Sequence, residues 1–441
     1  MPDGLTVMVV DAGARGHVLS TVFEKSPQVK KVVIAPGNDY MTVSRNKEVV
    51  TEPASSLKDA NSLLEVAKQH RVDLVEVAQD DALEAGTVDL MQKHGIAVLG
   101  PRRDAARIEW DKRWSREFMT RQGIPTPEYR YFQSKNADPA KAYAKELYAQ
   151  NPERLLFIKA TGLIGGKGAL PASTLGEAEA AISQMQAFGA AGDEFLIEEG
   201  LIGEEYSYYA MTDGTNFQTF KSAQDNKRVY DGDKGGQTGG IGAVAPALVT
   251  EGIREQIEAV QIAPAVTGLS SEGTPYLGLL YLGGIKTADG LNTIEYNARW
   301  GDPEVQVVLP GVQNDYVEVV EAALNGRLDS YTITEDDKVR MCVVGCSKGY
   351  PDDYSAVKGK EIKGLDDARA QPGIALYSAA IKVDDGKYYA NGGRLFSVVG
   401  EGKDLLEARD RAYDAIKRIS VEGDGLHYRT DIGRRDLARL G

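Results

Sequence analysis

The stretch IEYNARWGDPE, residues 294–304, places charged and amide side chains at alternate positions of a segment that begins like a β-strand. Side chains of a strand alternate between its two faces, so Glu295, Asn297 and Arg299 share one face and the intervening residues the other. A carboxylate and an amide oxygen are hard donors suited to Mg²⁺, and an arginine can grip a phosphate or a carboxylate. The stretch therefore predicts a strand whose polar face holds a metal ion and an anion. A half-exposed edge strand is the alternative.

The composition is that of a globular protein that does not bind polyanions nonspecifically. The chain has 441 residues and a formal net charge of -14. Nonspecific binding to nucleic acid or to an anionic membrane requires a basic face, so we expect neither partner. The two cysteines and four histidines form no zinc-binding pattern, and no apolar run is long enough for a membrane span. We expect a cytoplasmic protein, either a monomer or a homodimer.

The order of predicted elements divides the chain into α/β units. Strands alternate with helices at the start of the chain, as in LTVMVVDAG, KKVVIAPGN and IAVLGP, which predicts a doubly wound parallel sheet. The predicted units are an N-terminal domain (1–105), a connecting helix (106–125), a small α/β unit (126–195), a larger central unit (196–330) and a C-terminal α/β domain (331–441).

A glycine-rich loop follows a predicted strand in FIKATGLIGGKGA, residues 157–169. Glycines let backbone N–H groups approach phosphate oxygens, and Lys159 and Lys167 can neutralise their charge. The loop is neither a Walker A loop nor a Rossmann fingerprint, because the required G-x-x-x-x-G-K-[ST] and G-x-G-x-x-G patterns are absent. A flexible turn is the alternative for this segment taken alone.

Two further segments carry charges in positions that suit a nucleotide. FLIEEGLIGEEYS, residues 195–207, reads as a strand and a hinge whose backbone can pair with an adenine edge and whose carboxylates can hold ribose hydroxyls. An acidic surface turn is the alternative. SAQDNKRVYDGDKGGQTGGIGA, residues 222–243, mixes charges with glycines, which favours a loop that closes over a charged ligand rather than a Gly/Ser spacer.

These motifs together resemble the ATP-grasp superfamily and, within it, the phosphoribosylamine–glycine ligase (glycinamide ribonucleotide synthetase) family. The segments that carry the resemblance follow one another in the family's order over nearly the whole chain: APGN, DNKR…DGD…TGGIGA, EYNARWGDPE, GYP, NGGR and YRTDIG. The resemblance implies a multi-domain ATP-grasp ligase, with a doubly wound N-terminal domain that binds the amine, a two-part ATP-grasp core with a small lid at 126–195, and a small C-terminal α/β domain.

The resemblance also implies a role for each matching residue. ATP would be bound by Lys112, Lys159, Gly165, Gly166, Lys167, Glu198, Glu199, Leu201 and Glu205. Mg²⁺ or Mn²⁺ would be ligated by Glu295 and Asn297, and glycine would be held by Arg299 and Asp225. Phosphoribosylamine would contact Gly13, Arg15, His17, Asp80 and Arg394.

The sequence departs from the family pattern mainly near the expected amine site. DAGARGH, residues 11–17, stands where the family usually has G-N-G-G-R-E-H, so that only Gly13, Arg15 and His17 match. Asp80 replaces a glutamate, Thr161 replaces an aspartate of the glycine loop, and LYSAA (376–380) replaces F-H-A-G-T.

The implied reaction is the ATP-dependent joining of glycine to 5-phosphoribosylamine through glycyl phosphate, a step of purine biosynthesis. Phosphoryl transfer depends mostly on positioning and charge neutralisation, which agrees with the absence of a Ser/His/Asp or Cys/His arrangement. A ligase of the same architecture that joins another acid or amine is the alternative. A catalytically inactive nucleotide-binding protein is a third hypothesis, disfavoured because both expected metal ligands, Glu295 and Asn297, are present.

Overall fold

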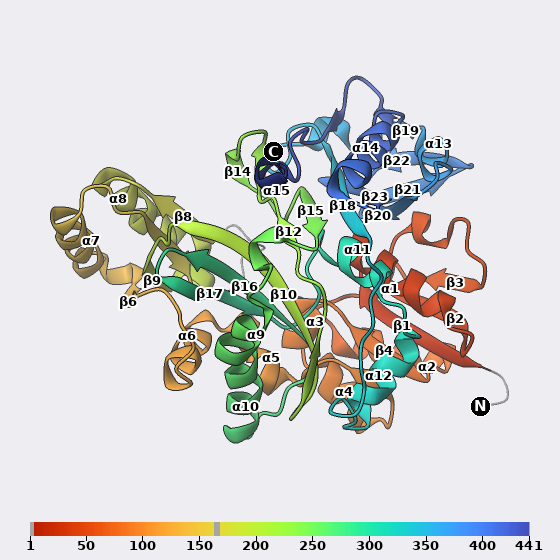
Figure 1. Cartoon of the computed structure of the whole chain (residues 1–441), viewed down its shortest axis with the longest axis horizontal. Coiled ribbons are helices and arrows are strands. Elements are labelled where there is room, and N and C mark those ends of the chain that lie inside the picture. Colours follow the sequence, from red (N-terminus) through yellow and green to blue (C-terminus); the bar gives the residue numbers. More distant parts are fainter. Residues whose placement is uncertain (1–3, 163–167, 441) are drawn as a thin grey trace.

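The N-terminal domain is built on a five-stranded parallel sheet in the order β3-β2-β1-β4-β5. The computed structural model describes residues 4–162 and 168–440 (Figure 1). The strands are β1 (Leu5–Asp11), β2 (Val29–Pro36), β3 (Glu48–Thr51), β4 (Leu74–Val77) and β5 (Ala97–Leu99). The flanking helices are α1 (Ala14–Lys25), α2 (Ala60–His70), α3 (Asp80–Glu84), α4 (Thr87–Lys93) and α5 (Arg103–Trp110).

Two details of this domain differ from the sequence prediction. Strand β3 was not predicted, because none of its four residues is buried and it therefore shows no apolar run. The segment LEAGTVDLMQKHG, residues 83–95, reads as a single helix in the sequence but contributes to two, because Gly86 lies between α3 and α4 with a φ of 78°. That left-handed conformation interrupts a helix and suits glycine.

The next unit, the lid, is a small domain with its own apolar core. Its four antiparallel strands have the order β6-β9-β7-β8: β6 (Tyr129–Gln133), β9 (Glu194–Glu199), β7 (Leu156–Ala160) and β8 (Ala169–Ala172). Helices α7 (Asp138–Gln150) and α8 (Leu175–Gln184) pack against this sheet. The expected boundary at residue 195 falls inside β9. Helix α6 (Lys112–Arg121), whose Asp111 cap accepts a hydrogen bond from Trp114 N (3.0 Å), connects the N-terminal domain to the lid.

The central unit is a four-stranded antiparallel sheet in the order β11-β10-β16-β17. Its strands are β11 (Phe217–Thr219), β10 (Gly203–Asp213), β16 (Leu277–Thr287) and β17 (Gly290–Asn297). Its helices are α9 (Arg254–Ile257), α10 (Ala263–Ser271), α11 (Val305–Val308) and α12 (Tyr316–Leu324). A π-helical turn, Glu258–Ile262, joins α9 to α10. One apolar cluster runs through this unit into both neighbouring domains and includes Val9, Tyr209 and Val344.

The main sheet of the C-terminal domain is completed by strands of the central unit. Its order is β12-β15-β18-β23-β20, with β25 also paired to β18. Strands β12 (Gln224–Asp225) and β15 (Gly242–Ala245) come from the central unit, whereas β18 (Val339–Ser347), β20 (Ile374–Ser378), β23 (Arg394–Gly402) and β25 (Leu426–His427) come from the C-terminal domain. Figure 1 shows β12 and β15 beside the blue C-terminal strands.

A second sheet and three helices complete the C-terminal domain. The sheet has the order β21-β22-β19-β24, with β21 (Ile381–Asp384), β22 (Lys387–Ala390), β19 (Glu361–Lys363) and β24 (Ser420–Val421). The helices are α13 (Leu365–Arg369), α14 (Leu405–Ile416) and α15 (Arg434–Leu440). The doubly wound N-terminal domain, two-part core and C-terminal α/β domain predicted from the sequence are confirmed. No helix in the described part of the chain is both long and apolar enough to cross a membrane.

Candidate active site

A cavity of about 710 Å³ lies where the N-terminal domain, the lid, the central sheet and the C-terminal domain meet. It is lined by most of the residues to which the sequence analysis assigned roles: Gly13, Arg15, Asp80, Lys112, Lys159, Glu198, Glu199, Leu201, Glu205, Asp225, Glu295, Asn297, Arg299 and Arg394. His17 is not in the lining, and Gly165, Gly166 and Lys167 lie outside the described residues.

Strand β17 brings the opening stretch into this cavity, and its pairing with β16 is irregular at Ile294. Glu295 pairs with Gly283 and Thr293 pairs with Gly284, so the ladder skips Ile294. This β-bulge places Ile294 in the cavity wall, although alternation predicts it on the opposite face. Glu295, Asn297 and Arg299 all line the cavity, as predicted. The period-two pattern contains no signal for an extra residue, which is why the bulge was missed.

Glu295 is surrounded by cations. Desolvation raises the pKa of its carboxyl, but Lys227, Lys112 and Lys159 together outweigh this effect and lower the pKa below its ordinary value. Glu295 is therefore an ionised oxygen donor exposed to the cavity. Together with the Asn297 amide it forms a hard donor pair that fits Mg²⁺, provided that other ligands come from the substrates.

Two lysines face this carboxylate from different elements. Lys112 is the first residue of α6, where the Asp111 cap starts the helix, and burial lowers the pKa of its ammonium group. Lys159, near the end of β7, contacts the buried Glu198 of β9. Positive charges on both sides of the cavity suit the phosphates of a nucleotide.

A buried arginine that the sequence analysis did not assign connects the lid to β17. Arg116 of α6 is 5% exposed, lies 2.5 Å from Glu198 Oε2, and donates to the Ile294 carbonyl (2.5 Å) and the Thr293 carbonyl (3.1 Å). It therefore links β9 of the lid to the bulged segment of β17. A single arginine in a basic helix gives no sequence signal for such a role.

Arg299 is held by a second unassigned residue, Glu109 of α5. Its Nη2 lies 2.8 Å from Glu109 Oε1, and Glu109 Oε2 accepts from Ala298 N (2.7 Å). Burial raises the pKa of Glu109 to about 7, although Arg299 acts in the opposite direction. This pairing aims Arg299 into the cavity beside Asn297, whose Oδ1 lies 3.3 Å from Nη2.

Asp225 has an unpaired carboxylate oxygen at the cavity. Its Oδ1 is buried, with no hydrogen-bond partner among the described residues. Burial and the nearby Glu304 raise its pKa well above the ordinary value. Glu304 itself accepts from Tyr281 Oη (2.8 Å) and Ser207 Oγ (3.1 Å). An unpaired buried acceptor beside a cavity suits a ligand that donates hydrogen bonds, such as an ammonium group.

Glu205, expected at the ribose, forms an ion pair with Lys227 (2.9 Å). Lys227 lowers the pKa of Glu205, and Glu205 in turn raises the pKa of Lys227. Lys227 belongs to the DNKR segment, but the sequence analysis assigned it no role. Glu199 and Leu201, in the hinge that precedes Glu205, also line the cavity. The sequence analysis expected an adenine on this side.

The first turn of the N-terminal domain is occupied by its own aspartate. Asp11 Oδ1 accepts hydrogen bonds from Gly13 N (2.6 Å) and Gly16 N (3.1 Å), and Oδ2 accepts from Arg15 Nε (2.8 Å). Arg15 Nη1 donates to the Trp300 carbonyl (2.9 Å). Gly13, Arg15 and Asp80 thus reach the cavity wall as expected, but Arg15 is already paired.

His17 lies between the N-terminal and C-terminal domains. Its Nδ1 accepts from Ser378 N (2.9 Å), and its ring packs edge-on against Tyr377 and Tyr40. Burial lowers its pKa well below the ordinary value, so the ring is neutral. These contacts align α1 with β20 of the C-terminal domain.

Arg394 of the C-terminal domain organises the glycine-rich segment. It donates to the carbonyls of Gly239 (2.7 Å) and Asp302 (2.7 Å) and forms an ion pair with Asp302 Oδ2 (3.1 Å). It thereby joins two segments, DNKR…TGGIGA and RWGDPE, at the cavity.

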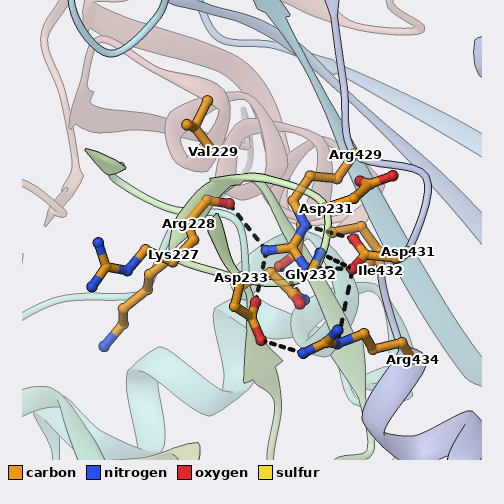
Figure 2. A network of polar contacts seen from close by, with 12 residues as sticks. Lys227, Arg228, Val229, Asp231, Gly232, Asp233, Arg429, Asp431, Ile432 and Arg434 are labelled. Atoms are coloured by element: carbon orange, nitrogen blue, oxygen red, sulfur yellow. Dashed lines mark hydrogen bonds and ion pairs between the residues drawn. The ribbon is translucent and has the colours of Figure 1, made fainter. Parts of the chain in front are cut away.

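A larger ionic network fixes the hairpin of β13 (Arg228–Tyr230) and β14 (Lys234–Gln237), which leads into the cavity wall at Thr238 (Figure 2). Arg429 is 0% exposed and contacts Asp233 (2.8 Å) and Asp431 (2.7 Å). Arg434 also binds Asp233, at 3.0 Å. The DGD and YRTDIG motifs are therefore partners in space, which their separation in the sequence did not reveal.

Three family models match the chain in consecutive blocks. The N domain of phosphoribosylglycinamide synthetase matches residues 5–109, its ATP-grasp (A) domain residues 110–305 and its C domain residues 340–435. The chain belongs to the phosphoribosylglycinamide synthetase family. The three matched ranges include residues from all four walls of the cavity.

Relatives in the phosphoribosylglycinamide synthetase family match over the whole chain. The phosphoribosylamine–glycine ligase of Allochromatium vinosum is 38% identical over 440 residues, covering 99% of each chain. The human trifunctional purine biosynthetic protein adenosine-3 is 37% identical over 439 residues, and the match spans 98% of this chain but 42% of that longer protein. The solved phosphoribosylamine–glycine ligase of Thermotoga maritima superposes with a TM-score of 0.76 at 27% identity, covering 97% of this chain and all of that one.

Proposed function

We propose that this protein catalyses the ATP-dependent ligation of glycine to 5-phosphoribosylamine. The observation that carries the proposal is the convergence of Glu295, Asn297 and Arg299 with Lys112 and Lys159 in one cavity of a member of this family. That set supplies metal donors, an anion-binding arginine and phosphate-binding cations, which are what phosphoryl transfer to a carboxylate requires.

In the first step a carboxylate oxygen of glycine attacks the γ-phosphorus of ATP, which forms glycyl phosphate and releases ADP. Lys112 and Lys159 would bind the phosphates, and Arg299, held in place by Glu109, would hold the carboxylate. Glu295 and Asn297 would hold Mg²⁺, which neutralises the phosphate charge when bound. Asp225 would accept hydrogen bonds from the glycine ammonium group through its unpaired Oδ1.

In the second step the amine nitrogen of phosphoribosylamine attacks the carbonyl carbon of glycyl phosphate. The C–N bond forms as the C–O bond to phosphate breaks, and the amine loses one proton. Asp80, the first residue of α3, would contact the ribose from the N-terminal domain wall. The residues proposed for both steps line one cavity, so the acyl phosphate would not need to leave before it is attacked.

A coupled assay of ADP release tests this function. We expect ADP release that requires both glycine and phosphoribosylamine, the latter generated in situ, and a product with the mass of glycinamide ribonucleotide. The proposed function would be contradicted if an enzyme that still binds ATP released ADP at the same rate with and without phosphoribosylamine.

The second candidate is a ligase of the same architecture that uses another amine. One observation favours it: the first turn, where the amine substrate was expected, is filled by Asp11. Profiling amines in the same assay separates the two candidates.

A further inference from the structure

Asp11, the last residue of β1, places a carboxylate of the chain itself at the N-terminus of α1. Asp11 is 0% exposed, and its two carboxylate oxygens accept hydrogen bonds from three donors: Gly13 N, Gly16 N and Arg15 Nε. A helix N-terminus with an adjacent arginine has the donors that a phosphate would use. Here those donors are already satisfied by a carboxylate of the chain itself.

Asp11 and Gly16 are sterically matched. A Cβ added at Gly16 would lie 2.7 Å from the Asp11 Cβ and 3.0 Å from its Oδ1. The Cβ–Cβ distance of 2.7 Å is shorter than real Cβ contacts, so the Asp11 side chain fits in this position because residue 16 has no side chain.

The other arginines at this end of the cavity are paired as well. Arg299 lies 2.8 Å from Glu109, and Arg394 lies 3.1 Å from Asp302. Asp80 adds another carboxylate to the same wall. An incoming phosphate would thus meet arginines that carboxylates already neutralise, in contrast to the lysine-rich wall around Glu295.

We propose, on the basis of the function proposed above, that Asp11 is a specificity-determining residue that competes with the phosphate of the amine substrate for the first turn. To bind there, a phosphate must displace the Asp11 carboxylate from both N–H groups and from Arg15. A substrate without a phosphate does not have to displace it. Asp11 therefore weakens the selection for a phosphorylated amine that this turn would otherwise provide.

Calorimetric titration with ribose 5-phosphate tests the competition without any turnover. Asp11→Gly should bind ribose 5-phosphate at least about tenfold more tightly than the wild type, the value of one charge-assisted hydrogen bond. Asp11→Asn keeps an acceptor for the two N–H groups but loses the charge, so it should show a smaller gain. Unphosphorylated ribose should bind all three proteins equally.

The matched control is Asp59→Gly, which removes another carboxylate at a helix N-terminus, one that caps α2 through Asn61 N (3.0 Å) and is not part of the cavity lining. It should leave ribose 5-phosphate affinity unchanged. Equal or weaker affinity in Asp11→Gly, or an equal gain for ribose, would overturn the assignment. If Asp11→Gly does not fold, Asp11→Asn decides alone: any gain specific to the phosphate supports the proposal, and no gain refutes it.

The two proposals fail in different ways. A wild-type enzyme that releases no ADP with glycine and phosphoribosylamine refutes the proposed function, whatever the Asp11 variants bind. A wild-type enzyme that is active with phosphoribosylamine, with Asp11 variants that gain no phosphate affinity, refutes only the role of Asp11.

Discussion

At the scale of single residues, Glu295 is the carboxylate with the most cationic surroundings in the cavity. Lys227, Lys112 and Lys159 all lower its pKa, although Lys112 lies in α6, Lys159 in β7 and Lys227 in the loop between β12 and β13. A carboxylate among three lysines is poorly explained as a structural ion pair alone. It is well explained if a metal and a polyphosphate bind between these groups.

Glu295→Ala should therefore abolish turnover at saturating ATP, with a loss of about 1,000-fold or more, because a metal ligand acts on the transferring phosphoryl group. The coupled ADP assay measures this loss. Asp289→Ala, on the exposed turn of the same β16–β17 hairpin, is the matched control and should keep wild-type turnover. Normal activity in Glu295→Ala would rule out the metal assignment.

Gly16→Ala should destabilise the wild type by about 1–3 kcal/mol, because the new methyl group would overlap Asp11. In the Asp11→Gly background the same change should become neutral or stabilising, since alanine is the better helix former by about 1 kcal/mol. Urea unfolding of the wild type, both single variants and the double variant measures the coupling. Additive free energies of unfolding would show that the two positions are independent.

At the scale of elements, the sequence predicted the strands that carry the site but not how they are aligned. The alternation of Glu295, Asn297 and Arg299 was readable, because side-chain polarity follows strand geometry. The bulge at Ile294 was not, because pairing with β16 decides it. The roles of Arg116 and Glu109 were also hidden, since each depends on contacts with residues more than 170 positions away. Lys159 was predictable because a glycine-rich loop follows it directly.

The buried Arg429 should contribute more than the exposed Arg434 to anchoring the β13–β14 hairpin. Arg429→Ala should destabilise the protein by about 3–5 kcal/mol, because it leaves Asp233 and Asp431 without a buried partner. Arg434→Ala removes a more exposed contact to the same Asp233 and should cost about 1 kcal/mol or less. Urea unfolding compares the two. Hydrogen exchange at Thr238 and Gly240 should accelerate in Arg429→Ala; equal costs for both variants would argue against the anchor.

At the scale of the whole molecule, the N-terminal and central domains share a buried acid. Glu76 of β4 accepts from Tyr316 Oη of α12 (3.2 Å), while its Oε2 has no partner among the described residues. Burial raises the pKa of Glu76 to about 8. The folded protein therefore keeps a proton on this group up to about pH 8, whereas the unfolded chain releases it near its ordinary pKa of about 4.5.

Because the folded state binds this proton more strongly, stability from Glu76 is fully present below about pH 4.5 and is lost as pH rises toward 8. Glu76→Gln cannot ionise, so its advantage over the wild type should grow between pH 6 and pH 9, by roughly 2–4 kcal/mol. Urea unfolding at both pH values measures this difference. Parallel stability curves for the two proteins would show that Glu76 does not titrate in this range.

The sheet shared by the C-terminal domain and the central unit limits how the polypeptide can be divided. Strand β15 lies between β12 and β18, and β18 begins just past residue 331, where the sequence suggested a domain boundary. Cutting the gene there would leave β15 as an open edge in one product and β18 as an open edge in the other, each prone to self-association. Two such fragments would be stable only when produced together, as an obligate heterodimer. For protein engineering, these two domains therefore form a single unit.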